Sequence, residues 1–293
     1  MPPEDELNDF RLSPKVRPSR YELRFDLDLD AWRFEGRGRI AIALDRAARD
    51  VTLHALDLDI AVARMDGEPA TRVSYDEGSQ TATLEFASEL APGEHVIELE
   101  WTGEIRGSLR GLYRSTRPGE RYAATQFEAA DARRAFPCFD EPEFKARFAL
   151  ELVHPTGLAA IANAPIEAQE EIAAGRTLTR FAEMPRISSY LVAFTVGPYD
   201  ATPAAQTRGG SPVRVWLPPG LVTQGAYARD AHVRSLEWLE EYTAIPYPYR
   251  KVDAIGLPDF EAGAMENPGA IMYRTRLLAA DQRTASVATL RAV

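Results

Sequence analysis

The sequence predicts a mainly β fold with antiparallel sheets up to about residue 200, followed by an α+β segment. Between residues 21 and 29, apolar side chains occupy every second position, which is the period of a half-buried strand. The same alternation returns several times, and turn signals at residues 66–69, 76–79 and 91–93 separate the runs closely. Near residue 200 the sequence becomes polar and rich in small residues, and the first long helical pattern follows. We therefore expect a domain boundary close to residue 200.

The individual elements follow from the local apolar pattern. Strands are predicted at residues 21–29, 40–44, 51–55, 83–86, 96–101, 148–152, 158–161, 177–181, 190–196 and 213–217. A helix is predicted after residue 220 because apolar side chains then recur at a period of about 3.6 residues, until the prolines of residues 245–248 end it. Its apolar stripe consists of Leu221, Tyr227, Ala231, Leu236, Leu239 and Tyr242. Residues 284–291 predict a second helix that stops without a cap or a terminating signal.

Composition and charge exclude several classes of protein. Hydrophobic residues make up 45% and charged residues 27% of the 293 residues, which excludes wholesale disorder and fibrous repeats. Lys and Arg number 34 against 44 Asp and Glu, a formal charge of −10. We therefore expect no nucleic-acid partner and no membrane partner, because nucleic acids and anionic membranes both attract a basic surface.

The single cysteine, Cys138, cannot form an internal disulfide, which indicates a reducing compartment. Residues 1–9 are acidic and lack the apolar stretch of a secretory signal, and no apolar run is long enough to span a bilayer. We therefore expect a cytoplasmic protein. The thiol could be interpreted as a nucleophile, but Phe136 and Phe139 flank it and no His or Lys is near it in sequence. We expect a small buried hydrophobic group instead.

The sharpest local feature is the run from Pro258 to Gly269. Gly263-Ala264 allows another chain to approach the backbone closely, and Glu266 is a carboxylate suited to accept hydrogen bonds from an ammonium group. The alternative is structural, since a Gly-Ala turn is common and an isolated Glu is usually a solvated surface group. On spacing alone the structural interpretation comes first.

The full strings resemble a known family. Residues 263–267, Gly-Ala-Met-Glu-Asn, resemble the exopeptidase signature of the M1 family of zinc aminopeptidases. Residues 125–145 are similar to the family's other long block almost position for position, and shorter similarities occur at residues 53–58, 111–115, 188–197 and 247–253. The similarity extends from about residue 10 to the end of the sequence.

This resemblance implies a fold, a substrate and a set of site residues. It implies a saddle-like β domain over residues 1–200 and the incomplete beginning of a thermolysin-like catalytic domain over residues 201–293. The expected partners are peptide substrates with a free N-terminus. The implied roles are substrate-backbone binding for Gly263, Ala264 and Met265, binding of the free α-amine for Glu266, and completion of the amine pocket for Gln126 and Glu128.

The chemistry agrees with these implied roles. An aminopeptidase must recognise a free ammonium group and reject an internal amide. Glu128 and Glu266 converging on one cation would supply short, charge-assisted hydrogen bonds that an amide cannot make. By contrast, Asp131, Arg133 and Arg134 are expected to form a structural ion network.

The sequence departs from the family in the motif that binds the metal ion. Zinc is the cofactor of the full-length family, but the His-Glu-x-x-His motif that binds it does not occur, and the histidines are His54, His95, His154 and His232. We therefore expect no catalytic residues, no metal ligands and no activity in this chain. A truncated sequence is favoured over a natural metal-free product, because the last helix stops in mid-pattern, and the missing C-terminal part of the catalytic domain is then an expected partner.

The expected parent protein is a zinc metalloaminopeptidase that hydrolyses the N-terminal residue of peptides. The alternative is a catalytically dead module that binds peptide N-termini or a protein partner. A generic β-sandwich interaction domain is a weaker third possibility, because it does not explain the two long motif blocks. Pro268 stands where many family members carry Trp, a difference expected to alter the wall near the first substrate side chain.

Overall fold

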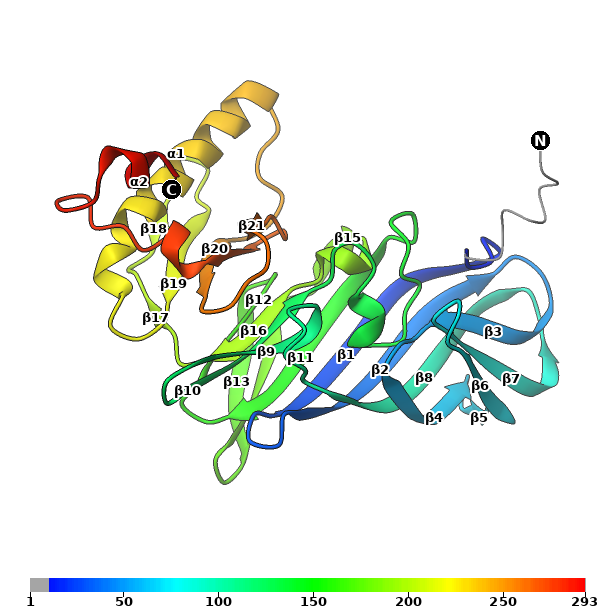
Figure 1. Cartoon of the computed structure of the whole chain (residues 1–293). Coiled ribbons are helices and arrows are strands. Elements are labelled where there is room, and N and C mark those ends of the chain that lie inside the picture. The colour runs from blue at the N-terminus through cyan, green and yellow to red at the C-terminus, as the bar shows by residue number, and fades with distance from the viewer. Residues whose placement is uncertain (1–10, 293) are drawn as a thin grey trace.

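The structure is a computed structural model that describes residues 11–292, and within this range the strands form four sheets. Figure 1 shows an elongated β part with the C-terminal part, including both α-helices of the described range, at one end of it. The predicted mainly β fold with an α+β C-terminal segment is confirmed. No helix within residues 11–292 is long and apolar enough to cross a membrane.

The long sheet forms the body of the β part. Its strands, in spatial order, are β13 (Ile166–Ala173), β14 (Arg176–Phe181), β11 (Ala146–Pro155), β1 (Val16–Asp28), β2 (Arg33–Leu44), β8 (Gly93–Glu104), β4 (Leu58–Met65) and β5 (Glu68–Pro69), with β15 (Met184–Ile187) also paired to β11. β1 and β2 form an antiparallel pair, but β1 and β11 run parallel. The sequence did not predict this parallel pair, because an alternating pattern specifies which side chains are buried and not the direction of the neighbouring strand.

A small sheet packs against the long sheet at the end far from the C-terminal part (Figure 1). It consists of β3 (Ala48–His54), β7 (Thr81–Leu90) and β6 (Arg72–Asp76). The apolar faces of the two sheets share one core, to which Leu53 and Leu84 of the small sheet contribute. The apolar side chains of the alternating patterns at residues 51–55 and 83–86 therefore point into this core, as predicted.

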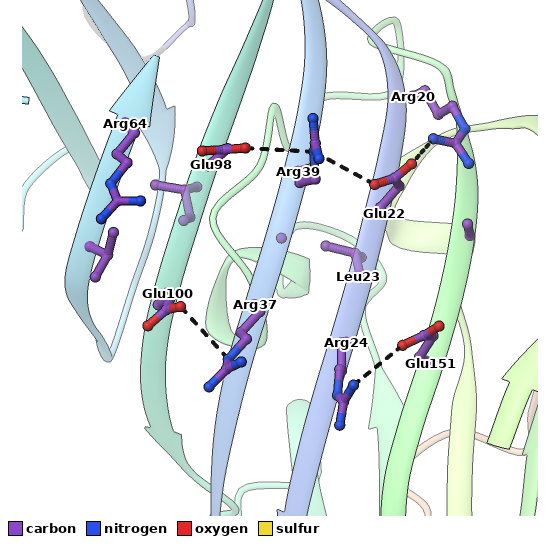
Figure 2. Close-up of a pocket in the computed structure, with 14 residues that line it drawn as sticks. Arg20, Glu22, Leu23, Arg24, Arg37, Arg39, Arg64, Glu98, Glu100 and Glu151 are labelled. Carbon is purple, nitrogen blue, oxygen red and sulfur yellow. Dashed lines mark hydrogen bonds and ion pairs between the residues drawn. The ribbon is translucent and has the colours of Figure 1, made fainter. Parts of the chain in front are cut away.

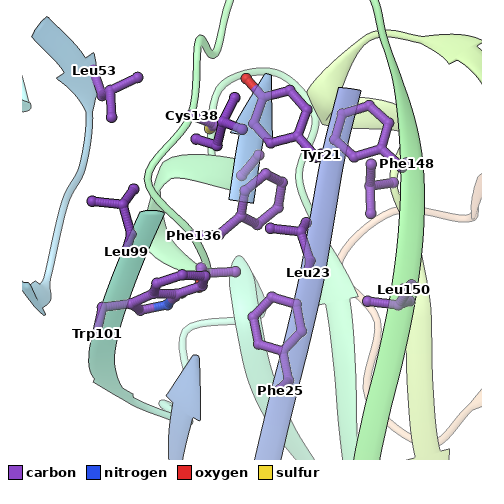
Figure 3. Close-up of a cluster of buried hydrophobic side chains, with 14 of the residues drawn as sticks. Tyr21, Leu23, Phe25, Leu53, Leu99, Trp101, Phe136, Cys138, Phe148 and Leu150 are labelled. Carbon is purple, nitrogen blue, oxygen red and sulfur yellow. Dashed lines mark hydrogen bonds between the residues drawn. The ribbon is translucent and has the colours of Figure 1, made fainter. Parts of the chain in front are cut away.

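The centre of this core is aromatic (Figure 3). The ring of Phe25 lies 6.1 Å from that of Trp101 and 6.3 Å from that of Phe136, both in edge-to-face geometry. The indole nitrogen of Trp101 donates a hydrogen bond of 2.8 Å to the Ala135 carbonyl, so its polar atom is satisfied. A Cβ at Gly36 would lie 2.1 Å from the indole, which explains the glycine in the middle of a strand.

A junction sheet connects the β part to the C-terminal part. Its strands are β12 (Ala159–Ala162), β16 (Phe194–Gly197), β10 (Glu120–Gln126) and β9 (Gly111–Arg117). Alternate residues of β10 enter different cores: Ala123 belongs to the main core, while Tyr122 and Ala124 belong to a second cluster that also contains Met265. The junction sheet is therefore buried on both faces and holds the C-terminal part against the β part.

The C-terminal sheet carries the signature residues. Its strands are β17 (Asp200–Ala201), β19 (Pro212–Leu217), β20 (Val252–Leu257), β22 (Ala270–Arg274) and β21 (Ala264–Met265), with β18 (Ala205–Gln206) also paired to β19. β19, β20 and β22 run parallel, and β21 is antiparallel to β22. Every residue of β20 is buried, so this strand lacks the alternation by which the other strands were predicted.

Two helices accompany this sheet, α1 (Ala226–Thr243) and α2 (Val287–Ala292). Both were predicted, but the expected burial of the α1 stripe is only partly right. Leu221 of the stripe packs against the cluster of the sheet, where Ala228, outside the stripe, is the buried residue of the helix, whereas Leu239 and Tyr242 of the stripe are 48% and 75% exposed. Within residues 11–292 no element covers the C-terminal half of this stripe.

The strand predicted at residues 190–196 is wrong in its first half. Ser189–Leu191 form a 3₁₀ turn, and β16 begins at Phe194. The side chain of Asn163 explains the difference, because it donates to the Leu191 carbonyl at 2.9 Å and accepts from the Ala193 N–H at 2.7 Å. These backbone groups are therefore satisfied without a neighbouring strand.

Candidate functional site

Ala264 and Met265 form the edge strand β21 of the C-terminal sheet. Ala264 lies opposite Tyr273 and Met265 opposite Met272 in the antiparallel pairing with β22. The sheet ends at β21 within the described part of the chain, so its outer backbone edge has no neighbouring strand there. A free edge can pair with an extended peptide through main-chain hydrogen bonds. Gly263, directly before the strand, is exposed and lies at the same edge.

The loop before β21 is held by one guanidinium group. Arg274 donates from Nε to the carbonyls of Phe260 and Ala262, at 2.9 and 2.8 Å, and from Nη2 to the carbonyl of Glu261. The backbone N–H of Arg274 also donates to the Gly263 carbonyl at 3.1 Å. The loop conformation therefore depends on a cation in the neighbouring strand, and sequence analysis missed this role for Arg274.

A second contact joins the same loop to the junction sheet. The Asp259 carboxylate accepts hydrogen bonds from the Ser115 hydroxyl at 3.0 Å and from the Thr116 N–H at 3.1 Å. The Asp259 N–H donates to the Ser115 hydroxyl at 2.9 Å, and the Tyr113 hydroxyl donates to the Asp259 carbonyl at 3.0 Å. The signature loop is thus fastened to β9, a strand more than 140 residues away in sequence.

Gln126 lies at the end of β10 on the face that meets this loop. Residues two apart on a strand share a face, and Ala124 on that face belongs to the same buried cluster as Met265. The side-chain oxygen of Gln126 is buried, and no hydrogen-bond partner for it occurs among the described residues. A buried acceptor without a donor from the protein is unusual, so this oxygen is free to accept a hydrogen bond from a bound group.

Glu128 and Glu266 are both exposed. Within residues 11–292, no hydrogen bond or ion pair joins either carboxylate to the other or to Gln126. The structure therefore places Gln126 on the strand face whose Ala124 shares a buried cluster with Met265, and it leaves the two carboxylates exposed, without contacts to the other predicted site residues. Their convergence on one ligand stays a prediction.

A tyrosine–histidine pair lies beside Glu266. Burial, and after it the charge of Glu266, raise the pKa of Tyr273 to about 12. The Tyr273 hydroxyl lies 2.8 Å from Nε2 of His232, and Nδ1 of His232 lies 2.8 Å from the Ala228 carbonyl. A carbonyl only accepts, so Nδ1 carries the proton and Nε2 accepts from the tyrosine. Burial lowers the pKa of His232, so the imidazole beside the site is neutral.

Several surface hollows lie away from the predicted site residues. One of about 550 Å³ lies on the outer face of the long sheet, and its lining contains none of the predicted site residues (Figure 2). Arginine and glutamate side chains of adjacent strands alternate across it, with Arg39 positioned 3.8 Å from both Glu22 and Glu98. Such exposed pairs contribute little stability each. This hollow is a solvated sheet face on which five arginines lie among four glutamates.

The block around Cys138 is structural, as expected. Cys138 is fully buried, and burial raises the pKa of its thiol, which therefore stays protonated. Arg133 pairs with the buried carboxylate of Asp140 at 3.0 Å, and Arg134 pairs with Asp131 at 2.8 Å. Asp131, Arg133 and Arg134 are thus structural ion-pair residues, as expected, but Arg133 pairs with Asp140 apart from the Arg134–Asp131 pair.

The imidazoles are all engaged in contacts within the protein. Nδ1 of His54 accepts from the Asp140 N–H, and His95 pairs with the Asp66 carboxylate at 2.6 Å. His154 bonds to the Thr179 hydroxyl at 2.8 Å, and His232 to Tyr273 as described above. Residues 11–292 contain no group of three or more His, Cys, Asp or Glu side chains arranged to hold a metal ion.

Comparison with protein families agrees with this geometry. The peptidase M1 N-terminal domain matches residues 17–191, more than half of the 293-residue chain, and the peptidase family M1 domain matches residues 227–293. The chain belongs to peptidase family M1. The matched ranges include Gln126 and Glu128 on one side and the 263–266 signature of this M1 protein on the other.

The M1 chain is also similar to named aminopeptidases. It is 42% identical over 282 residues to aminopeptidase M1-C of Oryza sativa subsp. japonica, which covers 94% of this chain and 32% of that relative. It is 40% identical over 291 residues to aminopeptidase M1 of Arabidopsis thaliana, and this match covers 94% of this chain and 33% of that relative. For the puromycin-sensitive aminopeptidase of Caenorhabditis elegans the identity is 35% over 282 residues, and this match covers 92% of this chain and 30% of that relative. The M1 chain thus spans about a third of the length of the curated relatives it matches.

Membership in this family implies a zinc cofactor. The described residues of the M1 chain do not fit that ion, because every imidazole is committed to another contact and no third ligand lies nearby. We therefore derive no step of a reaction through zinc.

Proposed function

We propose that the whole protein is a zinc metalloaminopeptidase that removes the N-terminal residue of peptides, and that residues 1–293 recognise the free N-terminus of the substrate. One observation carries this proposal. The unpaired edge of β21 displays the signature residues beside the face of β10 on which the buried side-chain oxygen of Gln126 has no partner within the described residues.

In this proposal the backbone of Gly263, Ala264 and Met265 pairs with the substrate backbone along the edge of the sheet. The carboxylates of Glu266 and Glu128, with the Gln126 oxygen, accept hydrogen bonds from the substrate ammonium. Charge-assisted bonds of this kind are about twice as strong as neutral ones. An acetylated N-terminus has no charge and fewer protons to donate, so it would leave these carboxylates without a partner.

The finer organisation belongs to the same proposal. The β domain covers residues 1–200 and the beginning of the catalytic domain covers residues 201–293. The zinc ligands and the general base are supplied by sequence beyond these residues, since the relatives are about three times as long. Residues 1–293 alone are therefore inactive. A cytoplasmic location is supported by Cys138, a lone and buried thiol.

Peptide affinity tests the proposed recognition. Binding of the purified chain to a short peptide is measured by calorimetry with the N-terminus free and with it acetylated. We expect the free peptide to bind about tenfold more tightly, a difference of about 1.4 kcal/mol. Glu266→Gln and Glu128→Ala should each reduce this preference, because each removes an acceptor for the ammonium.

The control is Glu89→Gln, which removes one exposed negative charge from β7, far from the signature loop. This variant should keep the preference for the free N-terminus. Equal affinity of the unsubstituted chain for both peptides would refute the proposed recognition. A preference that survives in both Glu266→Gln and Glu128→Ala would refute the roles of these carboxylates.

A further inference from the structure

The backbone directly after Glu266 is held from several directions. The Asn163 side chain donates to the Pro268 carbonyl at 2.9 Å, and the Gly269 N–H donates to the Tyr247 hydroxyl at 3.1 Å. The Lys251 ammonium donates to the Gly269 carbonyl at 2.7 Å. These partners come from the turn after β12 and from the segment between α1 and β20. Both the β part and the C-terminal part therefore hold this short stretch.

Lys251 is the central member of this arrangement. It is 6% exposed, and its ammonium contacts the Ala162 carbonyl at 2.7 Å, the Gly269 carbonyl at 2.7 Å and the Asp253 carboxylate at 2.6 Å. An ammonium group has three protons to donate, and these contacts use all of them. The contacts connect β12 of the junction sheet, the residues after the signature and β20 of the C-terminal sheet through one buried cation.

The geometry leaves the backbone little room to move. Gly269 has a φ of +74°, and a Cβ at this position would lie 2.0 Å from the Asn163 carbonyl oxygen. Asn163 itself is oriented by its bonds to Leu191 and Ala193. The chain at Gly269 is therefore packed directly against a rigid turn of the β part.

Glu266 lies between two such fixed points. On its N-terminal side Met265 is buried and paired with Met272 in the sheet. On its C-terminal side Asn267 is buried, and Gly269 is bound by Lys251. We propose that Lys251 is a positioning residue for Glu266, which fixes the direction in which this carboxylate leaves the sheet edge by binding the backbone on its C-terminal side. This inference rests on the proposed function for the role of Glu266 toward the substrate amine.

The choice of variant follows from the charges. Burial lowers the pKa of Lys251, while the adjacent Asp253 acts in the opposite direction. Removal of the lysine alone would leave a buried carboxylate without a partner, which is strongly destabilising. The informative variant is therefore Lys251→Met combined with Asp253→Asn, which removes both charges and keeps similar side-chain volumes. Asp253→Asn alone also removes one charge of the buried pair, but it retains the lysine's donors to both carbonyls, and its amide oxygen can still accept from the ammonium, so it serves as the conservative variant.

The experiment has one readout for function and one for the loop. The functional readout is the ratio of the dissociation constants for acetylated and free peptide, measured in the 293-residue chain. We expect this ratio to fall from about tenfold to about threefold or less in the double variant, and to stay near its original value in Asp253→Asn. The loop readout is amide hydrogen exchange of the non-proline residues among 266–270, which should accelerate about tenfold in the double variant while β1, β2 and β8 stay protected.

Arg250→Met is the matched control, because it removes a neighbouring cation whose side chain is 69% exposed and only 3.9 Å from Glu167 at the surface. It should change neither readout. Unchanged exchange at residues 266–270 in the double variant would overturn the positioning role, whatever the peptides do. If the loop loosens but the peptide ratio is kept, positioning of Glu266 by Lys251 is likewise refuted. If the unsubstituted chain shows no preference for a free N-terminus, the proposed function fails, and the exchange measurement still decides whether Lys251 holds the loop.

Discussion

His54 shows how one buried side chain sets a pH dependence. It is 1% exposed, its Nδ1 accepts from the Asp140 N–H at 3.2 Å, and burial, with a smaller contribution from Arg133, lowers its pKa from 6.5 to about 3. The imidazole is therefore neutral in the folded protein. The unfolded chain takes up the proton first on acidification, since its histidine keeps a pKa near 6.5.

This difference predicts a loss of stability in mild acid. The contribution of His54 is complete above pH 6.5 and falls as the pH drops from there toward 3, with about 2 kcal/mol lost at pH 5. Urea unfolding at pH 7.5 and pH 5 measures the loss. His54→Asn, whose amide oxygen can accept from Asp140, should show a smaller loss. Some loss remains in that variant, because burial also lowers the pKa values of His154 and His232, and both therefore reduce the stability of the folded protein in acid. An equal loss in both proteins would contradict the prediction.

Among the elements, β9 and the loop before β21 depend on each other. Asp259 is an exposed residue of this loop. Its carboxylate and backbone nevertheless make hydrogen bonds to Ser115, Thr116 and Tyr113 of β9. Arg274 holds the next carbonyls of the same loop. The edge strand is only two residues long, so these contacts add to its pairing with β22 in determining its position.

A double-mutant cycle tests this coupling between elements. Ser115→Ala and Asp259→Asn should each destabilise the chain, and their effects should fall short of additivity by about 1 kcal/mol, because both disrupt the same hydrogen bonds. The free energies of unfolding come from urea titrations of the parent, the two single variants and the double variant. Strict additivity would mean that the Asp259 contact does not hold the loop.

At the scale of the whole molecule, a second buried cluster joins the β part to the C-terminal part. The rings of Tyr122 and Tyr199 lie 5.0 Å apart within it, and Met265 and Met272 of the C-terminal sheet complete it. On the other side of that sheet, the rings of Trp238 and Tyr242 on α1 stack 5.0 Å apart, and both side chains are exposed. The edge strand β21 thus rests on a packed junction through Met265.

The whole chain is therefore predicted to bind without catalysis. Purified residues 1–293, dialysed against zinc and then against buffer, should hold well under one zinc ion per chain by elemental analysis. They should also release no product from an aminoacyl reporter, whereas a full-length zinc aminopeptidase assayed in parallel should do so. The physical reason is that the imidazoles are engaged in internal hydrogen bonds. One zinc per chain together with turnover would overturn this prediction.

The elements that sequence predicted well are those with a local signal. β1, β2 and β8 alternate along their length, because one face is buried and the other carries the charges of the open sheet. β20 escaped prediction because it is buried on both faces. The turn at Ser189–Leu191 escaped because Asn163, distant in sequence, satisfies its backbone.

The sequence by itself determined the strands that alternate, such as β1, β2 and β8. Through the strings at 125–145 and 263–267 it also determined the family and the candidate recognition residues. Only the tertiary structure decided that, within residues 11–292, β21 lies at the edge of its sheet and the buried side-chain oxygen of Gln126 has no partner. It also decided that Asp259 and Lys251 hold the loop around Glu266. The reason is physical: periodicity and motifs depend on neighbours along the chain. A hydrogen bond between residues 89 or 144 positions apart depends on how the sheets pack.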